Sequence, residues 1–333
     1  MEASGTKGFI VITSIFDPTE AISLFAGFKQ YNLVVVGDKK TPAGWKHHNV
    51  EFLDIRQHKR IGKSLNKVLP KNHYCRKMIG YLYAIERRAP FIIDTDDDNL
   101  PKENWAFPEM EANHFLVPGE LGFINVYQLF TKSKIWPRGL PLNLIGKQYD
   151  LEPGIEQRPC KVGIWQGLAD DDPDVDAIYR LTNNTPCYFD KREPIVLGNN
   201  TISPFNSQNT FITNKLFALL YLPAYVTFRF TDILRGLVAQ PIMWLHGYSL
   251  GFTDATVIQK RNVHNFYKDF LSEIPVYRYS EDIIEITRSA IHSKYSIDEN
   301  LMNAYEALYK KGIVKKIELA VLNEWLKELQ LLK

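Results

Sequence analysis

The chain has 333 residues, of which 45% are hydrophobic and 13% aromatic, so it can bury a large core. Its 40 basic and 38 acidic residues leave a formal net charge of +2, which excludes a global field that would direct it to nucleic acid or to anionic lipid. Three cysteines, Cys75, Cys160 and Cys187, lack metal-ligand spacing and are odd in number, which fits a reducing compartment rather than a disulfide framework.

The first residues, MEASGTKG, carry no signal-peptide pattern, and no apolar run approaches the roughly 18 to 20 residues of a membrane span. We therefore expect a cytoplasmic protein without a transmembrane segment. Peripheral attachment to a membrane is the alternative.

Two apolar runs near the N-terminus, residues 8–14 (GFIVITS) and 33–36 (LVVV), are typical of strands buried on both faces. A helix start at residues 17–20 (DPTE) separates them, and this strand–helix–strand order predicts a parallel sheet. Ligands bind such sheets at the carboxyl ends of the strands, so Thr13, Ser14 and Asp38 are expected in one crevice. Asp38 either accepts from a ligand's hydroxyl or base N–H groups or only forms a turn, and both interpretations stay open.

A basic segment follows between residues 56 and 88. Its cations are Arg56, Lys59, Arg60, Lys63, Lys67, Lys71, Arg76, Lys77, Arg87 and Arg88. Most of them are expected on the solvated surface. Arg60, Arg76 and Lys77 are the candidates for phosphate contact, because cations just ahead of an acidic metal site can share the charge of a diphosphate.

That acidic site is predicted in residues 91–101 (FIIDTDDDNLP), where a short apolar strand leads into four carboxylates and a proline closes the segment. Crowded carboxylates raise one another's pKa unless a cation neutralises them, so Asp96 and Asp98 are predicted ligands of a divalent metal, Mn²⁺ or Mg²⁺. Asp97 is expected to face the same ligand. The alternative is an acidic solvated loop or a helix N-cap.

Residues 102–160 are rich in Pro, Trp and Asn, and they are predicted to form loops and short strands over the crevice. A strand at residues 164–167 then leads into a second acidic cluster at residues 170–176 (DDDPDVD). Pro173 interrupts this cluster, and the pattern from Asp174 and Asp176 onward favours a capped helix start over a second metal site.

Residues 204–210 (PFNSQNT) combine amides and hydroxyls, which favours recognition of a hydroxyl-rich ligand through Asn206, Gln208 and Asn209, with a polar turn as the alternative. After a mostly apolar stretch at residues 216–226, expected to be helical, Asp232 stands between Arg229 and Arg235. Asp232 is the candidate general base of a group transfer. Its alternative role is a structural ion pair with either arginine.

Residues 280–333 show a helical pattern. The apolar stripe in this region consists of Ile317, Val321, Leu322, Trp325, Leu326 and Leu329. We expect it to pack on the preceding domain, with homo-oligomerisation or partner docking as alternatives. The predicted organisation is a first domain over residues 1–275 and a C-terminal helical extension over residues 276–333.

Several of these segments together resemble the STELLO family of glycosyltransferase-like proteins and, more distantly, the plant reversibly glycosylated polypeptides that act as UDP-arabinopyranose mutases. The resemblance covers roughly residues 8–265, and the helical region after Ser280 lies beyond it. The segments that carry it are residues 35–42, 70–85, 94–99, 165–170, 173–181, 204–210 and 228–236.

This resemblance implies an α/β fold of the GT-A-like, nucleotide-sugar-binding type, with a central, mainly parallel sheet. The Asp96-x-Asp98 pair then matches the metal-binding Asp-x-Asp of such enzymes, a UDP-sugar is the default donor, and a late histidine, His264 or His246, completes the metal shell. The resemblance also places Trp165 and Asp176 beside the sugar, where an aromatic face could stack.

Arg138 occupies the place at which the mutase-like relatives are glycosylated, but Leu140 replaces the aromatic residue of their Arg-Gly-aromatic-Pro segment. Contact of Arg138 with phosphate or sugar is therefore favoured over self-glycosylation, and a surface arginine is the alternative. The function expected is metal-dependent transfer of a sugar to a glycan or other hydroxyl acceptor. The alternatives are a nucleotide-sugar mutase and a non-catalytic scaffold of glycan synthesis.

Overall fold

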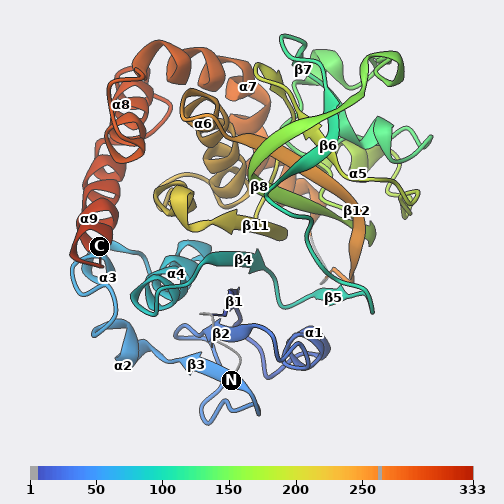
Figure 1. Cartoon of the computed structure of the whole chain (residues 1–333). Coiled ribbons are helices and arrows are strands. Elements are labelled where there is room, and N and C mark those ends of the chain that lie inside the picture. The colour runs from blue at the N-terminus through green and yellow to red at the C-terminus, as the bar shows by residue number, and fades with distance from the viewer. Residues whose placement is uncertain (1–6, 262–264, 333) are drawn as a thin grey trace.

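A ten-stranded mixed sheet runs through the structure, a computed structural model that describes residues 7–261 and 265–332 (Figure 1). In sheet order the strands are β3 (Val50–Leu53), β2 (Asn32–Val36), β1 (Phe9–Thr13), β4 (Phe91–Thr95), β11 (Asn209–Thr213), β8 (Glu156–Asp171), β6 (Glu111–Val117), β9 (Ile195–Leu197), β12 (Ser249–Gln259) and β5 (Asn99–Pro101). The strands from β3 to β4 are parallel, as the sequence predicts, whereas β11 lies antiparallel between β4 and β8. Two short strands, β7 (Gly122–Phe123) and β10 (Thr201–Ile202), form a separate parallel pair.

The central strand β1 is buried on both faces, which explains its unbroken apolar sequence. Phe9 and Val11 join one hydrophobic cluster and Ile10 and Ile12 join the other, because side chains alternate across a strand. Helix α4 (Lys77–Glu86) packs on the first face and α1 (Glu20–Phe25) on the second. Gly80 allows the close approach of α4, since a Cβ there would lie 2.5 Å from a methyl carbon of Val11.

Helix α1 starts where its sequence predicts. The Thr19 hydroxyl oxygen caps the helix by accepting from the Ile22 backbone N–H, and the same hydroxyl donates to the Asp97 carbonyl at 2.6 Å. The loop after β1 is thereby joined to the acidic loop after β4. The short helix α5 (Ala177–Thr182) also starts as predicted, with Asp176 as its N-cap.

The remaining helices are mostly short turns before residue 231 and long helices after it. They are α2 (Ile55–His58), α3 (Leu65–Val68), η1 (Tyr74–Arg76), η2 (Val126–Leu129), η3 (Leu142–Leu144), η4 (Glu152–Gly154), η5 (Asn214–Leu220), η6 (Phe228–Phe230), α6 (Thr231–Leu245), α7 (Phe266–Ala290), α8 (Ile297–Lys310) and α9 (Lys316–Leu332). The helix expected over residues 216–226 is only the 3₁₀ segment η5. Pro223 explains its early end, because proline disfavours helical backbone in the residue before it.

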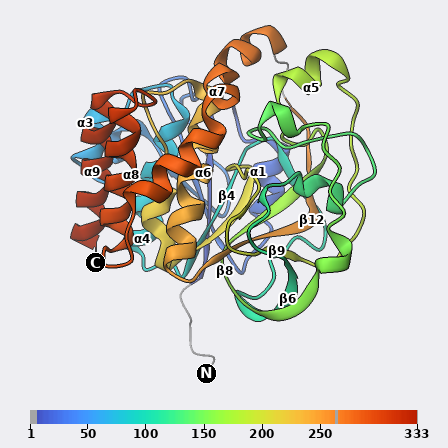
Figure 2. The ribbon, with the colours of Figure 1, turned by 90° about the horizontal axis from the view of Figure 1, so that it is seen from above.

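Helices α7, α8 and α9 form one side of the molecule, and α9 lies against α3 and α4 of the first half (Figure 2). The predicted packing of this region on the preceding domain is therefore confirmed. Val321, Trp325 and Leu329 of the stripe are buried, whereas Ile317 is 45% exposed. The predicted boundary between residues 275 and 276 lies inside the continuous helix α7.

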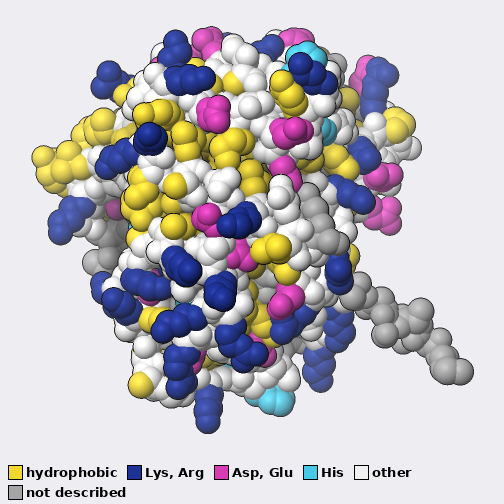
Figure 3. All heavy atoms as spheres, turned by 90° about the vertical axis from the view of Figure 1, so that its left-hand side faces the viewer, with side chains coloured by type: hydrophobic (Ala, Val, Ile, Leu, Met, Phe, Trp, Pro, Cys, Tyr) yellow, Lys and Arg dark blue, Asp and Glu magenta, His cyan; other side chains and the backbone are white. Residues whose placement is uncertain are grey.

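Most of the basic segment is solvated, as expected. Figure 3 shows basic side chains gathered on the lower half of the face to which α2 and α3 belong. Lys59, Arg60 and Lys63, which lie between α2 and α3 in the chain, are exposed. All three cysteines are free thiols. Among the residues described, no helix combines the length and the apolar character needed to cross a bilayer.

Candidate functional site

A cavity of about 310 Å³ opens at the carboxyl ends of β1, β2 and β4. The fold brings most of the predicted site residues to this one place, as expected for the edge of a parallel sheet. Those that line it are Thr13, Ser14, Asp38, Arg76, Asp96, Asp97, Asp98, Arg138, Asn206, Gln208 and Asp232.

The acidic loop after β4 supplies three carboxylates that differ in their partners. Asp96 Oδ1 accepts from Lys77 Nζ at 2.8 Å, and Asp97 Oδ2 accepts from Ser14 Oγ at 2.5 Å. Asp98 Oδ2 lies 3.3 Å from Gln259 Nε2, whereas Asp98 Oδ1 is buried and has no hydrogen-bond partner among the described residues. Burial raises the pKa of Asp96 and of Asp97 to about 6 and also raises that of Asp98, and neighbouring carboxylates add to each shift. The loop therefore holds more negative charge than its partners neutralise.

These carboxylates fit a divalent cation only together with a ligand. Within the described ranges, no group of three or more His, Cys, Asp or Glu side chains is arranged to hold a metal ion by itself. Asp96 and Asp98 offer hard carboxylate oxygens, and Asp98 Oδ1 accepts no hydrogen bond from a described residue. Mg²⁺-like ions are commonly held by one or two carboxylates plus substrate phosphates, so the donor set suits such an ion in the presence of a phosphorylated ligand.

The predicted histidine ligand His264 lies outside the described residues. His246 follows α6 and lies near Asn300 Nδ2 at 3.2 Å, and it does not line the cavity. His246 therefore does not contribute a ligand at the carboxylates of the acidic loop.

Lys77 is fully buried and does not line the cavity, contrary to its predicted contact with phosphate. Its Nζ lies 2.7 Å from Asp94 Oδ1 and 2.8 Å from Asp96 Oδ1. Burial alone would lower the pKa of Lys77, but these two carboxylates raise it. Lys77 therefore holds Asp96 in place from behind, and it leaves the second oxygen of Asp96 to face the cavity.

Arg76 differs from Lys77 in both respects: it lines the cavity, and it lacks a carboxylate partner among the described residues. It is 1% exposed. Its Nη2 donates to Asn66 Oδ1 at 2.7 Å and lies 2.5 Å from His58 Nδ1, whereas Nε and Nη1 are buried without a partner. Burial lowers the pKa of Arg76, and the charge of Asp38 offsets this desolvation only in part. A buried cation in this state is a candidate anion site.

Thr13 and Ser14 end β1, and Asp38 follows β2, so sheet geometry alone brings them together. The Ser14 backbone N–H donates to the Val36 carbonyl at 3.2 Å. Asp38 Oδ1 accepts from the Lys39 N–H at 2.8 Å, and its Oδ2 accepts from the His73 N–H at 3.4 Å. Asp38 thus shapes its turn and also lines the cavity, so the turn interpretation and the ligand interpretation are compatible.

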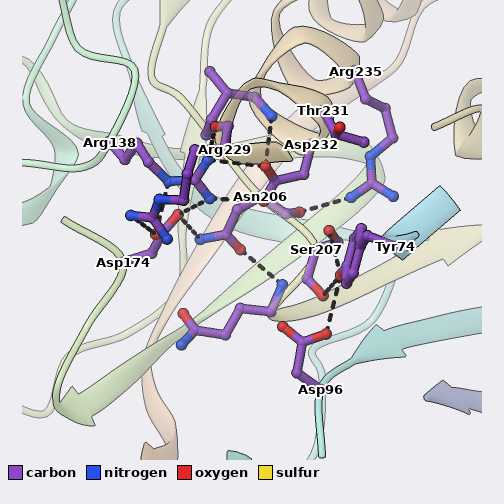
Figure 4. A network of polar contacts seen from close by, with 12 residues as sticks. Tyr74, Asp96, Arg138, Asp174, Asn206, Ser207, Arg229, Thr231, Asp232 and Arg235 are labelled. Atoms are coloured by element: carbon purple, nitrogen blue, oxygen red, sulfur yellow. Dashed lines mark hydrogen bonds and ion pairs between the residues drawn. The ribbon is translucent and has the colours of Figure 1, made fainter. Parts of the chain in front are cut away.

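The opposite wall is a buried ionic network centred on Arg138 (Figure 4). Arg138 binds both oxygens of Asp174 at 2.9 and 3.0 Å and both oxygens of Asp232 at 2.9 and 3.0 Å. It also donates to the Arg229 carbonyl, so all five N–H groups of its guanidinium are used. Burial alone would lower the pKa of Arg138, and the two carboxylates raise it well above its usual value. The surface alternative for Arg138 is wrong.

Asp232 forms the ion pair that the sequence left open, with Arg138 rather than with Arg229 or Arg235. Arg229 pairs with Glu273, and Arg235 pairs with Asp94 beneath the cavity. Asp232 nevertheless lines the cavity, which places one carboxylate opposite the acidic loop.

Asn206 and Gln208 line the cavity, but most of their polar atoms already have partners. Asn206 Nδ2 donates to Asp174 Oδ2 at 2.8 Å, and its Oδ1 accepts from the Gln208 N–H at 2.9 Å. The Gln208 amide contacts Gln259 Oε1. These amides therefore rigidify the wall between the acidic loop and the Arg138 network.

Four predicted ligand contacts are wrong because the side chains do not reach the cavity. Trp165 is 0% exposed and packs over Gly251, so it cannot present a face to a sugar. Asp176 caps α5 and accepts from Trp136 Nε1 at 2.8 Å. Asn209 is buried against Trp105 and Thr256, and Arg60 lies exposed at the surface.

The sequence predictions give no role to three further lining residues, Tyr74, Gln259 and Arg261, and they give Asp174 a role only in a capped helix start. The Tyr74 hydroxyl lies 3.0 Å from Asp96 Oδ1 and 2.8 Å from Ser207 Oγ. Gln259 and Arg261 arrive at the end of β12, far away in sequence from the acidic loop. Only Tyr74 could have been predicted from the sequence. It lies one helical turn before Lys77, so the two side chains are expected on the same face.

The parallel strands, the cavity at their carboxyl ends and the packed C-terminal helices define an α/β protein with a glycosyltransferase-like fold. A family model described as STELLO glycosyltransferases matches residues 229–333. The chain is 26% identical over 350 residues to "Probable glycosyltransferase STELLO1" of Arabidopsis thaliana, covering 97% of this chain and 44% of the relative. It is 25% identical over 345 residues to "Probable glycosyltransferase STELLO2" of the same plant, covering 97% of this chain and 45% of the relative.

The predicted resemblance to the STELLO family is thus confirmed. The chain spans less than half the length of these two relatives. The family match includes α7, α8 and α9, so the prediction that the C-terminal helices lie beyond the resemblance is wrong. The distant likeness to the reversibly glycosylated polypeptides stays a prediction.

Proposed function

We propose that this protein transfers a sugar from a nucleotide-diphosphate donor, a UDP-sugar by default, to a hydroxyl group of a glycan or another acceptor. The donor diphosphate would lie between Arg76 and the carboxylates of Asp96 and Asp98, together with Mn²⁺ or Mg²⁺.

One observation carries this proposal: the cavity contains an unpaired buried cation and an unpartnered buried carboxylate oxygen. Arg76 has two free N–H nitrogens, and Asp98 Oδ1 has no donor among the described residues. An anion alone would be repelled by the acidic loop, and a metal cation alone would leave Arg76 uncompensated. A diphosphate with a divalent cation satisfies both, because its oxygens accept from the guanidinium and also bind the metal.

The residues around the donor then have separate roles in the transfer. When bound, the metal ion supplies Lewis-acid neutralisation of the diphosphate charge. Arg76 stabilises the negative charge that develops on the leaving phosphate oxygen as its bond to the anomeric carbon breaks. Lys77 and Tyr74 hold Asp96 from the protein side, so that its free oxygen stays directed at the cavity.

Asp232 is the proposed general base. As the acceptor oxygen forms its bond to the anomeric carbon, its proton passes to a carboxylate oxygen of Asp232. Asp174 is the other carboxylate on this wall, but Arg138, Asn206 and burial hold it inside the protein. Arg138 orients Asp232 through two hydrogen bonds, and it does not need to leave its site.

The geometry does not favour a mutase that works through glycosylation of Arg138. All five N–H groups of that guanidinium are engaged with Asp174, Asp232 and the Arg229 carbonyl, and the side chain is buried. A nucleophilic guanidine nitrogen would have to abandon two ion pairs.

A thermal-shift panel tests the proposal, because a ligand that binds only the native state raises the melting temperature according to its affinity. UDP and UDP-sugars with Mn²⁺ should raise the Tm, whereas uridine or Mn²⁺ alone should raise it less. The absence of any shift with nucleoside diphosphates would contradict donor binding. Ring-isomerised UDP-sugar formed without acceptor would favour the mutase, and intact biological function of Asp96→Ala would favour the scaffold.

A further inference from the structure

The short helix α3 is held at its start by a carboxylate from the C-terminal helix α9. Glu328 is 8% exposed, and its Oε1 accepts from the Ser64 N–H at 2.6 Å, from Ser64 Oγ at 2.6 Å and from the Leu65 N–H at 3.4 Å. Ser64 is the N-cap residue of α3, yet its own side chain makes no capping bond. Glu328 therefore supplies the cap that α3 lacks, from 264 residues away in sequence.

A second carboxylate of α9 acts on the other end of α3. Glu318 is fully buried and accepts from the N–H groups of Ala224 and Tyr225, each at 2.8 Å. The hydroxyl of Tyr225 in turn donates to the carbonyl of Val68, the last residue of α3, at 2.8 Å. Helix α9 thus contacts α3 directly at its first turn and through Tyr225 at its end.

Helix α3 carries the residue that holds the unpaired arginine of the cavity. Asn66 Oδ1 accepts from Arg76 Nη2 at 2.7 Å and from Lys71 Nζ at 3.1 Å. A four-residue helix has almost no stability of its own, since helix nucleation is unfavourable in short segments. The position of Asn66 therefore depends on the contacts that fix α3 from outside.

We propose that the C-terminal helix α9 is a working part of the donor site: Glu328 and Glu318 fix α3 at both ends, and Asn66 then orients the Arg76 guanidinium toward the bound diphosphate. Glu328, Glu318 and Asn66 are positioning residues in this scheme, because none of them touches the donor. The proposal rests on the proposed function insofar as Arg76 binds phosphate.

Plain packing would not need these groups. Burying a carboxylate costs free energy unless hydrogen bonds compensate it, and apolar side chains would join α9 to the core at no such cost. Glu328 instead accepts from the first residues of α3, and Glu318 accepts from the Tyr221 hydroxyl and from the N–H groups of Ala224 and Tyr225. Trp325 and Leu329 already supply the apolar contact.

The test compares Glu328→Ala with the conservative Glu328→Gln and with Asn66→Ala, which removes the last link without touching α9. Glu324→Ala is the matched control, because Glu324 lies on the same helix and contacts Lys327 rather than α3. The first readout is the Kd of UDP with Mn²⁺, set against the Kd of uridine. Glu328→Ala and Asn66→Ala should each weaken UDP binding about tenfold and leave uridine binding unchanged, and they should not be additive with Arg76→Ala.

The second readout needs no ligand. Burial and then the charge of Arg76 lower the pKa of His58 to about 4, so the NMR titration of its imidazole reports where Arg76 lies. Glu328→Ala and Asn66→Ala should raise this midpoint by about half a pH unit or more, whereas Glu328→Gln should restore part of the change and Glu324→Ala should have no effect.

The two readouts distinguish a failure of the proposed function from a failure of the inference about α9. A wild-type protein that binds neither UDP nor pyrophosphate contradicts the proposed function, and the His58 midpoint still decides the role of α9. An unchanged midpoint in folded Glu328→Ala or Asn66→Ala protein overturns the inference. An equal loss of uridine and UDP binding also overturns it, because that pattern would mean general damage to the fold.

Discussion

The two acidic clusters of this protein are similar in composition and opposite in chemistry. In the cluster at residues 170–176, Asp170 pairs with Lys102 and Asp172 pairs with Arg180 and Arg261, so cations neutralise these carboxylates. In the cluster at residues 94–98, Asp97 and Asp98 accept side-chain hydrogen bonds from the neutral groups of Ser14 and Gln259, and cations act on them only from a distance. The first cluster is structural, and the second is the one that we propose to bind a cation.

The pKa values follow the same division. Burial alone would raise the pKa of Asp174, but the guanidiniums of Arg138 and Arg229 hold it well below its usual range. Burial raises the pKa of Asp96 to about 6 despite Lys77. Asp176 also has a pKa raised to about 6, yet both of its oxygens accept hydrogen bonds, from Tyr179 and Trp136. A raised pKa therefore marks a binding site only where an oxygen also lacks a partner.

The largest effect is expected at Asp232, the member of the Arg138 network that faces the cavity. Asp232→Asn keeps an oxygen for Arg138 but cannot take a proton, so kcat for sugar transfer should fall about 10²- to 10⁴-fold. The Kd for UDP, measured by calorimetry, should change less than about threefold, since the proposed donor position is at the opposite wall. Transfer at more than about a third of the wild-type rate would remove Asp232 from the mechanism.

Asp174→Asn should lower the free energy of unfolding, because Asp174 belongs to the structural cluster. It leaves Arg138 and Arg229 with less counter-charge inside the protein, and the loss of one partner of a buried pair costs about 3–5 kcal/mol. Denaturant unfolding measures this loss. Asp171→Asn, in the same cluster, is the control: Asp171 has a φ of 74°, which asparagine tolerates, so its free energy of unfolding should change by less than about 0.5 kcal/mol.

His58 reports on Arg76, the buried cation that lines the cavity. Its pKa falls from 6.5 to about 4, through burial and then through Arg76, so the neutral imidazole is the native form. A group with a depressed cationic pKa contributes stability that is complete above pH 6.5 and is lost as the pH falls toward 4. The contribution is about 3 kcal/mol at most.

The stability of wild-type protein minus that of His58→Gln should therefore decrease between pH 6.5 and 4. Asp96, Asp97 and Asp176, whose raised pKa values act in the opposite direction, are common to both proteins and cancel in this difference. A flat difference curve from urea unfolding at several pH values would show that His58 is not held neutral.

Local signals predicted the parallel half of the sheet and the acidic loop. The unbroken apolar runs of β1 and β2 and the cap at Thr19 depend on near neighbours, and the carboxyl ends of parallel strands meet by geometry. The sequence predicts Arg76 as a candidate for phosphate contact, but nothing in the neighbouring residues indicates that it lacks a carboxylate to form an ion pair. Whether a charged side chain is paired depends on residues distant in sequence.

The wrong predictions share that cause. Lys77 and Arg76 are adjacent, yet one turns under the acidic loop and the other lines the cavity. Trp165 and Asn209 lie on strands in the middle of the sheet, where neighbouring strands cover them. The hydrogen bonds between Ser64 and Glu328 join residues that are 264 positions apart. No local sequence pattern in either segment predicts them.

Asp98→Asn gives the smallest effect and the sharpest contrast with Asp174→Asn. The substitution removes a desolvated charge whose Oδ1 has no partner, so the ligand-free protein should be as stable as wild type or slightly more stable. The Kd for UDP with Mn²⁺ should nevertheless rise at least about tenfold, which corresponds to about 1.4 kcal/mol. Uridine binding should be unchanged. If Asp98→Asn instead destabilised the ligand-free protein as Asp174→Asn does, the carboxylate would be structural, and the contrast between the two clusters would be lost.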